Sequence, residues 1–163
     1  LMRQDRYLRS RNGRIEAKVP LEIKLDVNIG NYREIEDEEE VRKEFGLGKG
    51  GIVDAIEDAG YGREIPIKTV RKKYKNGEFN IDIDEVNFGH RVAEIELLVS
   101  SESEAQEAVD KIMSFAKSLG IEVKGDIYIR GKVMEYLYRK DRQSYKEVIE
   151  AWKKLNTEHL RSN

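Results

Sequence analysis

The sequence contains no cysteine, two prolines and one tryptophan among 163 residues. Without cysteine, the chain has neither a disulfide framework nor a thiolate metal site, which is typical of a protein kept in a reducing compartment. No apolar run approaches the roughly 18 residues that a membrane-spanning helix needs, and the charged first residues do not match a secretory signal peptide. We therefore expect a soluble, cytoplasmic protein with no membrane partner.

A large excess of charge of either sign is also missing. Charged residues make up 38% of the chain, yet the formal net charge is only -2, so acidic and basic side chains must alternate or face each other. The chain has no overall basicity that would indicate a nucleic-acid partner. Its length suits a single domain over residues 1–163 with a buried core, and we expect it to be a monomer.

Residues 78–98, EFNIDIDEVNFGHRVAEIELL, predict two antiparallel strands. Acidic and aliphatic residues alternate in both halves, and a strand sends successive side chains to opposite faces. If the halves pair around residues 85–89, their acidic faces coincide. The carboxylates gathered there would be Asp82, Asp84, Glu94 and Glu96. Like charges opposite one another destabilise a sheet, so this patch is either a solvated outer face or part of a charged interior.

Asn-Gly pairs, the strongest short hairpin signal, predict two further turns. Asn12-Gly13 joins strands over residues 7–11 and 14–20, while Asn76-Gly77 joins a strand starting at Ile65 to the acidic strand. Further strands are expected over 21–27 and 32–35. Several of these strands are apolar on one face and charged, mostly basic, on the other. Such a set indicates a closed or nearly closed barrel lined with charge, although an ordinary hairpin with a solvated face explains each strand taken alone.

Helices are expected over 36–45 and 52–59, after Ser101, within 127–138 and over about 143–155. Ser101 and Glu104 have the spacing of a capping box, and an apolar stripe from Ala108 to Leu119 follows them. This helix should pack on the apolar outer side of the barrel. The glycine-rich run GLGKGG between the first two helices lacks the preceding strand and the GK[ST] ending of a phosphate loop, so we interpret it as a flexible connector.

Five short motifs occur in a characteristic order: LRSR, IEAK, VRKKY, NIDID and AEIE, with an FG pair between the last two. In this order they resemble the CYTH superfamily of triphosphate tunnel metalloenzymes, and among its members those that hydrolyse thiamine triphosphate are most similar. The match extends over nearly the whole chain, including the lysine of GKVMEYL. The resemblance implies an α+β fold, in which an eight-stranded antiparallel tunnel has a charged lumen and helices packed outside.

The resemblance also implies site residues. By motif position, the cations that would bind phosphate are Arg9, Arg11, Lys18, Arg71 and Lys132, and the carboxylates that would bind Mg²⁺ or Mn²⁺ are Asp82, Glu94 and Glu96. Glu34 matches a further acid of the lumen. Tyr7 stands where the members that hydrolyse thiamine triphosphate carry a tryptophan that stacks on the thiamine ring. Lys18 is the candidate for orienting the attacking water.

One departure concerns the first strand of the family, whose ExExK motif supplies two metal-binding glutamates and a lysine. That motif is absent here, so the fold is expected to be incomplete at its N-terminus. The function implied is metal-dependent hydrolysis of a small-molecule triphosphate, above all thiamine triphosphate. The alternatives are an inorganic tripolyphosphatase or an adenylate cyclase of the same fold, a (poly)phosphate-binding module without catalysis, and an inert charged domain.

Overall fold

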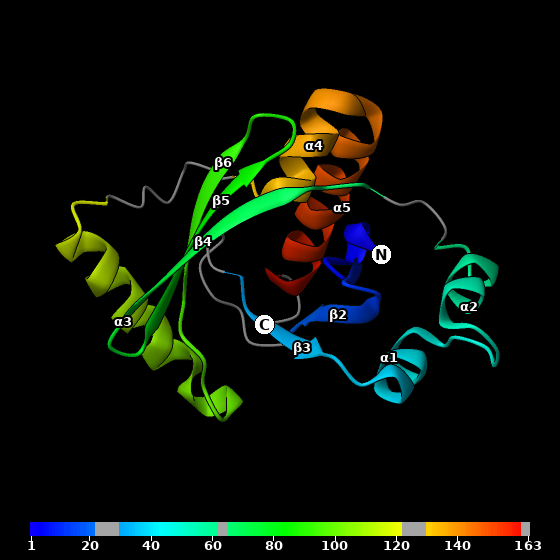
Figure 1. Ribbon diagram of the computed structural model, residues 1–163, viewed down its shortest axis with the longest axis horizontal. Coiled ribbons are helices and arrows are strands. Elements are labelled where there is room, and N and C mark those ends of the chain that lie inside the picture. The colour runs from blue at the N-terminus through cyan, green and yellow to red at the C-terminus, as the bar shows by residue number, and fades with distance from the viewer. Residues whose placement is uncertain (22–29, 62–64, 122–129, 161–163) are drawn as a thin grey trace. The chain divides into compact units, whose positions relative to one another are not determined.

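The computed structural model describes residues 1–21, 30–61, 65–121 and 130–160 (Figure 1). The chain divides into two compact units. The first comprises Leu1–Leu21, Tyr32–Ile65 and Arg142–Asn163, and the second comprises Glu22–Asn31 and Pro66–Asp141. Among the described residues, each unit contains one three-stranded sheet. That the units form a single domain stays a prediction.

The sheet of the first unit is antiparallel, with strands in the order β1 (Tyr7–Arg11), β2 (Arg14–Pro20) and β3 (Tyr32–Ile35). Asn12 and Gly13 connect the first two strands with φ of 52° and 79°. Positive φ at both positions is what a two-residue hairpin turn requires, because it matches the twist of the flanking strands. The predicted hairpin and the predicted third strand are therefore confirmed.

Two helices follow this sheet, α1 (Glu38–Phe45) and α2 (Ile52–Asp58). The Asp37 carboxylate caps α1 by accepting a 3.0 Å hydrogen bond from the Glu40 amide, and Gly46 ends the helix in the left-handed conformation. Helix α1 packs on the apolar face of the sheet. The buried cluster consists of Ala17, Val19, Ile35, Val41 and Phe45. The other face of the sheet is thereby left to its polar side chains.

The chain ends of the first unit also contact each other. The short η1 turn (Met2–Gln4) lies against α5 (Arg142–Leu160), and the Trp152 indole N–H donates a 2.7 Å hydrogen bond to the Met2 carbonyl. Helix α5 was predicted to end near residue 155 and in fact continues to Leu160. No helix within the described ranges has both the length and the apolar character needed to cross a bilayer.

The second unit contains the acidic hairpin. Its sheet has the order β4 (Thr69–Asn76), β5 (Phe79–Val86) and β6 (Arg91–Glu96), with antiparallel pairing throughout. Asp82 lies opposite Glu94 in the register, so the two acidic faces coincide as predicted. Strand β4 begins at Thr69 and not at Ile65 as expected. Pro66 explains the difference, because proline has no N–H to contribute to a strand ladder.

Two helices accompany this sheet, α3 (Ala105–Ser118), preceded by the η2 turn (Glu102–Glu104), and α4 (Lys132–Lys140). The predicted capping box is present, since the Glu104 carboxylate accepts a 3.2 Å hydrogen bond from the Ser101 amide. Phe115 of α3 stacks on Phe79 with ring centroids 4.3 Å apart. Phe79 is on the aliphatic face of β5, so α3 packs against the Phe79 end of that face, while Ile83 further along it stays exposed. The packing of this helix on an apolar face is thus found at one end of the sheet only (Figure 1).

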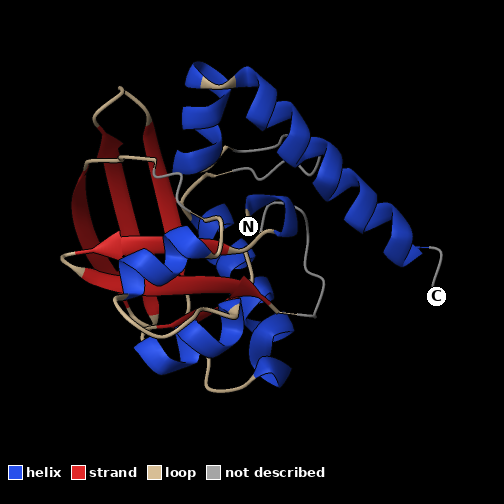
Figure 2. Cartoon of the chain, turned by 90° about the vertical axis from the view of Figure 1, so that its right-hand side faces the viewer, coloured by secondary structure: helices blue, strands red, loops and turns tan. Residues whose placement is uncertain are grey.

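The sheets and helices confirm an α+β fold (Figure 2). The strand predicted over 21–27 lies mostly outside the described residues, as does the start of the helix predicted within 127–138. Closure of the strands into a tunnel, and its incompleteness at the N-terminus, stay predictions.

Candidate functional site

The polar face of the first sheet collects the residues predicted there. The register sets Tyr7 opposite Lys18 and, across the next strand pair, Lys18 opposite Glu34. Paired residues of an antiparallel sheet point to the same face. The predicted residues on this face are Tyr7, Arg9, Arg11, Lys18 and Glu34. The alternation of each strand therefore brings one aromatic ring, three cations and one carboxylate together.

These cations are balanced by two carboxylates of the same face. The Lys18 ammonium lies 2.5 Å from Glu34, and the Arg9 Nε donates to Glu16 over 2.6 Å. Longer ion pairs join Arg9 to Glu34 at 3.6 Å and Arg11 to Glu16 at 3.7 Å. Burial alone would raise the pKa of Glu34, but the hydrogen bond from Lys18 and the nearby arginines hold that pKa below its ordinary value. An anionic ligand would have to replace these carboxylates as the partner of the cations.

An aromatic pair borders the same cations. The rings of Tyr7 and Tyr32 meet edge to face, with centroids 6.0 Å apart, and both hydroxyls donate hydrogen bonds to Asp5. Burial raises the pKa of the Asp5 carboxyl, although the hydrogen bonds from the two tyrosines oppose this. The Lys18 ammonium lies 5.9 Å from the Tyr32 ring centroid. Tyr7 lies opposite Lys18 in the register and beside Tyr32, so it is an aromatic neighbour of the cations on this face.

The acidic face of the second sheet brings together the three carboxylates predicted to bind a metal. Asp82, Glu94 and Glu96 each offer an oxygen within 4.8 Å of the other two. Asp82 is buried, so this face is not the fully solvated surface that was the alternative interpretation of the pattern. Carboxylate oxygens are the ligands that Mg²⁺ and Mn²⁺ prefer. The donor set therefore fits a hard divalent cation.

Two predicted phosphate-binding cations lie on the same face and hold a fourth carboxylate. Arg71 donates from Nε and Nη2 to the two oxygens of Asp84, both over 2.7 Å. Lys132 lies 2.6 Å from Asp84 and 2.6 Å from Glu94, while Arg71 also contacts Asp82 and, at 3.1 Å, Glu94. The hydrogen bond from Arg71 is the main reason that the pKa of Asp84 falls to about 2, and the same contact raises the pKa of Arg71.

Asp84 was placed on this face by the strand alternation but was given no role in the predicted site. Its side chain is fully buried. It accepts hydrogen bonds from Arg71 and from Lys132, which lies 48 residues further along the sequence than Asp84. The alternation in NIDID was the available signal. It could not show which cation would reach which carboxylate, because Lys132 comes from a distant helix.

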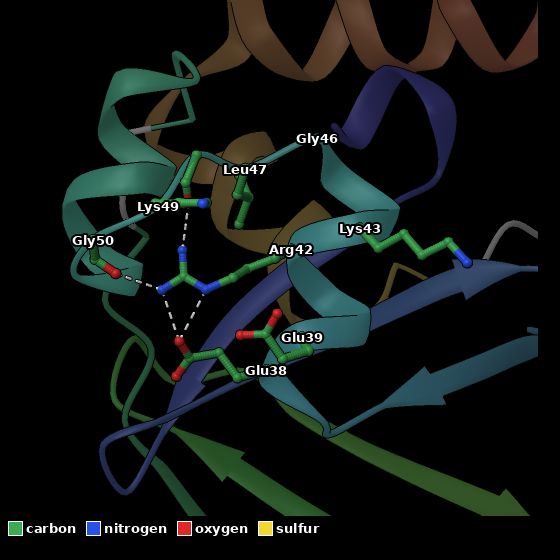
Figure 3. Close-up of a pocket in the computed structure, with 9 residues that line it drawn as sticks. Glu38, Glu39, Arg42, Lys43, Gly46, Leu47, Lys49 and Gly50 are labelled. Carbon is green, nitrogen blue, oxygen red and sulfur yellow. Dashed lines mark hydrogen bonds and ion pairs between the residues drawn. The ribbon is translucent and has the colours of Figure 1, made fainter.

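A separate hollow lies beside the glycine-rich loop and contains none of the predicted site residues (Figure 3). Arg42 of α1 donates to Glu38 and to the Gly48 and Gly50 carbonyls over 2.6 and 2.7 Å. The loop connects α1 to α2 as predicted, but these contacts hold it to α1 through Arg42, so it is not the flexible connector that was expected. Helix α1 covers the apolar face of the first sheet, so this hollow is not on the sheet face that carries Arg9 and Lys18.

Each sheet thus carries a face of fixed charges, basic with matched acids in one and acidic with matched bases in the other. The protein is thus an α+β protein whose acidic cluster has the ligand types that a divalent cation takes. The CYTH domain matches residues 1–127, and the chain belongs to that family. The five sequence motifs had indicated this membership, and the match confirms it.

Individual relatives agree with this placement. The chain is 25% identical to a thiamine-triphosphatase from Macaca fascicularis and 26% identical to the one from Homo sapiens, each over 93% of this chain and 72% of the relative. The solved structure of the PH1819 protein from Pyrococcus horikoshii is similar with a TM-score of 0.54 and 27% identity, over 84% of this chain and 75% of that one.

Proposed function

We propose that this protein hydrolyses a triphosphate with the help of a divalent cation, and that thiamine triphosphate is its preferred substrate. The main supporting observation is the second sheet, where three carboxylates that can share a cation lie beside Arg71 and Lys132. A triphosphate with its cation needs this combination of charges. The relatives named thiamine-triphosphatase support the choice of substrate.

The cations of the first sheet that are proposed to bind phosphate already have carboxylate partners. In the absence of substrate Arg9, Arg11 and Lys18 are paired with Glu16 and Glu34. A triphosphate offers more negative charge than these carboxylates and can take over the hydrogen bonds. Guanidinium groups suit phosphate because they donate two parallel N–H bonds. The acids keep the cations in place until substrate arrives.

The proposed cation is Mg²⁺ or Mn²⁺, held by Asp82, Glu94 and Glu96. When bound, such an ion neutralises phosphoryl oxygens and lowers the pKa of water. Asp84 is not one of the three carboxylates whose oxygens converge, and both of its oxygens accept from Arg71 and Lys132. Its role would be to hold these two cations beside the carboxylates, so that the transferred phosphoryl group meets positive charge that needs no reorganisation.

Lys18 is proposed to orient the attacking water. Its ammonium is held by Glu34 and is partly exposed, so it can donate to a water molecule as well as to a phosphate oxygen. In this role Lys18 positions the water relative to a phosphoryl group bound by Arg9 and Arg11 of the same sheet. Loss of Lys18 should then reduce kcat more than it raises KM.

The test is phosphate release from thiamine triphosphate, inorganic tripolyphosphate and ATP, measured with Mg²⁺, with Mn²⁺ and with chelator. We expect release only with the metal, and the highest kcat/KM for thiamine triphosphate. Glu94→Gln is the variant expected to abolish turnover, and Glu85→Gln, on the opposite face of the same sheet, is its matched control. Metal-independent turnover, or equal rates for the control and Glu94→Gln, would contradict the proposal.

The assay also separates the other functions that the sequence left open. Preference for inorganic tripolyphosphate would indicate a tripolyphosphatase, and formation of cyclic AMP and pyrophosphate from ATP would indicate a cyclase. Binding of triphosphates without turnover would indicate a phosphate-binding module. The ion pairs around Arg71 and Arg9 are compatible with binding in each case, so catalysis is what distinguishes these functions.

A further inference from the structure

Lys132 is the first residue of α4, so its position depends on how the start of that helix is held. The N-cap residue is Gly131, which provides no side-chain hydrogen bond to the helix. Yet the Lys132 ammonium reaches Asp84 and Glu94 at the same time. A lysine side chain has four rotatable bonds and loses much rotamer freedom when fixed. Something other than the helix cap must therefore fix the start of α4.

Glu135, one turn further along α4, is the group that does so. It is 5% exposed and accepts hydrogen bonds from the Nε atoms of Arg130 and, over 2.7 Å, Arg139. Burial alone would raise the pKa of Glu135, but the two arginines hold it below its ordinary value. This ionised carboxylate joins Arg130, which precedes the N-cap residue, to Arg139 in the last turn of the helix.

Both arginines are also tied to the turn between β5 and β6. The Nη1 atom of Arg139 donates to the Phe88 carbonyl over 2.8 Å, and the Arg130 carbonyl lies 3.1 Å from Nε2 of His90. The Phe88 ring meets Tyr136 of α4 edge to face at 5.8 Å. Glu135 is thus the charged centre of the contacts that dock α4 on the hairpin carrying Asp84 and Glu94.

We propose that Glu135 is a positioning residue for Lys132. It holds α4 against the β5–β6 turn so that the Lys132 ammonium stays between Asp84 and Glu94. That Lys132 binds phosphate rests on the function proposed above, whereas the placement of Lys132 does not. The two statements therefore need separate measurements.

The first measurement is the reactivity of Lys132. The full-length protein is acetylated briefly with chelator present, well below its melting temperature, and peptide mass spectrometry gives the modification of Lys132 relative to exposed Lys72. In Glu135→Gln the amide cannot accept from both arginines, because its nitrogen is a donor. We expect this ratio to rise at least threefold.

The matched control is Glu107→Gln, which removes a helical glutamate that pairs with Lys111 over 3.0 Å in α3 of the same unit. This control should leave the Lys132 ratio unchanged. If Glu135→Gln does not fold, Arg139→Lys decides, because lysine keeps the charge but lacks the fork that reaches Glu135 and Phe88 together. Arg139→Lys should also raise the acetylation of Lys132 relative to Lys72.

An unchanged ratio in the folded variants overturns the proposal, even if their melting temperatures fall, because Glu135 would then only stabilise the fold. The second measurement is kinetic. If the wild-type protein hydrolyses triphosphates, Glu135→Gln should raise KM for tripolyphosphate several-fold, and Glu107→Gln should not. If the wild type shows no hydrolysis, the proposed function fails, while the acetylation ratio still decides the role of Glu135.

Discussion

Asp84 shows how a buried charge can be retained without being the main source of stability. Its side chain is fully buried, and it receives two hydrogen bonds from Arg71 and one from Lys132. Removing charges from water costs several kcal/mol, and such pairs often do no more than offset that cost. Removing one partner is a different matter, because the remaining charges stay buried without compensation. We infer that Asp84 is kept for the arrangement of the cations.

Asp84→Asn should therefore lower the free energy of unfolding by about 3 kcal/mol, at the lower end of the range for a broken buried pair, because Arg71 retains contacts to Asp82 and Glu94. Urea unfolding followed by circular dichroism measures this. Glu85→Gln, which removes an exposed carboxylate on the opposite face, should change the same quantity by no more than about 0.5 kcal/mol. Equal effects of the two substitutions would show that Asp84 is not a buried hub.

Glu135 predicts a pH dependence of stability. Its pKa is lowered in the folded state, so its contribution to stability is complete above its ordinary pKa of 4.5 and is lost as the pH falls through the folded value. The difference in unfolding free energy between wild type and Glu135→Gln should thus shrink on acidification from pH 6 to pH 3. Urea midpoints at several pH values test this. A difference that grows towards low pH would contradict the lowered pKa.

Tyr7 and Arg11 make separable contributions to substrate binding. A charge-assisted hydrogen bond is worth about 1.5 to 3 kcal/mol, whereas one stacked ring is worth about 0.5 to 1.5 kcal/mol. Arg11→Ala should weaken the binding of thiamine triphosphate and of tripolyphosphate by similar factors. Tyr7→Ala should weaken the binding of thiamine triphosphate only. Tyr7→Phe, which keeps the ring and loses the hydrogen bond to Asp5, should weaken the binding of neither ligand. Calorimetry on both ligands decides, and equal losses for Tyr7→Ala would make Tyr7 a packing residue.

At the scale of elements, local sequence signals located the hairpins and most helices. Asn12-Gly13 determined the first turn and its register because both residues take positive φ. The second hairpin was predicted with its turn at Asn76-Gly77, but Asn76 pairs with Phe79, so the turn residues are Gly77 and Glu78, and of the pair predicted only Gly77 has positive φ. The alternation in β5 and β6 then decided which residues share a face. The predicted start of β4 at Ile65 was wrong because Pro66 interrupts an otherwise strand-like run.

What sequence could not supply was the partner of each charge. From the sequence, Glu135 looks like an ordinary solvated residue of α4. Its burial is explained by its hydrogen bonds with Arg130 and Arg139, which lie beside the β5–β6 turn. The same holds for Asp84 and Lys132. Contacts between distant segments depend on tertiary packing, and periodicity carries no information about them. Motif order over the whole chain supplied the candidate site residues that local patterns left open.

The carboxylates of the β5–β6 hairpin lead us to predict that a divalent metal ion raises the melting temperature of the protein. If Asp82, Glu94 and Glu96 bind Mg²⁺ or Mn²⁺ only when folded, an ion at 100 times its dissociation constant should stabilise the protein by about 2.7 kcal/mol. Glu96→Gln is the cleaner change, because Glu94 also pairs with Arg71 and Lys132. Melting temperatures should rise with metal in the wild type and in Glu85→Gln, and much less in Glu96→Gln. Identical melting with metal and with chelator would exclude a metal site here.

At the scale of the whole molecule, each unit carries its own set of charged residues on one sheet face. The first sheet has Arg9, Arg11 and Lys18 with their acids. The second has the carboxylates with Arg71 and Lys132. The second set combines three carboxylates that can share a cation with two phosphate-binding cations, whereas the first offers no group of three carboxylates among the described residues. The proposed function therefore depends above all on the second set, and each set is tested by a substitution in its own unit.

A last prediction concerns phosphate binding by the second set. Titration of the protein with tripolyphosphate and Mg²⁺ should give a calorimetric binding event, and Lys132→Met should weaken it by roughly tenfold to a hundredfold, since the substitution removes a charge-assisted bond of about 1.5 to 3 kcal/mol. The ammonium of Lys132 is held beside Glu94 and Asp84, so its loss removes a positive charge next to the proposed cation. An affinity that Lys132→Met leaves at the wild-type value would show that Lys132 does not bind phosphate.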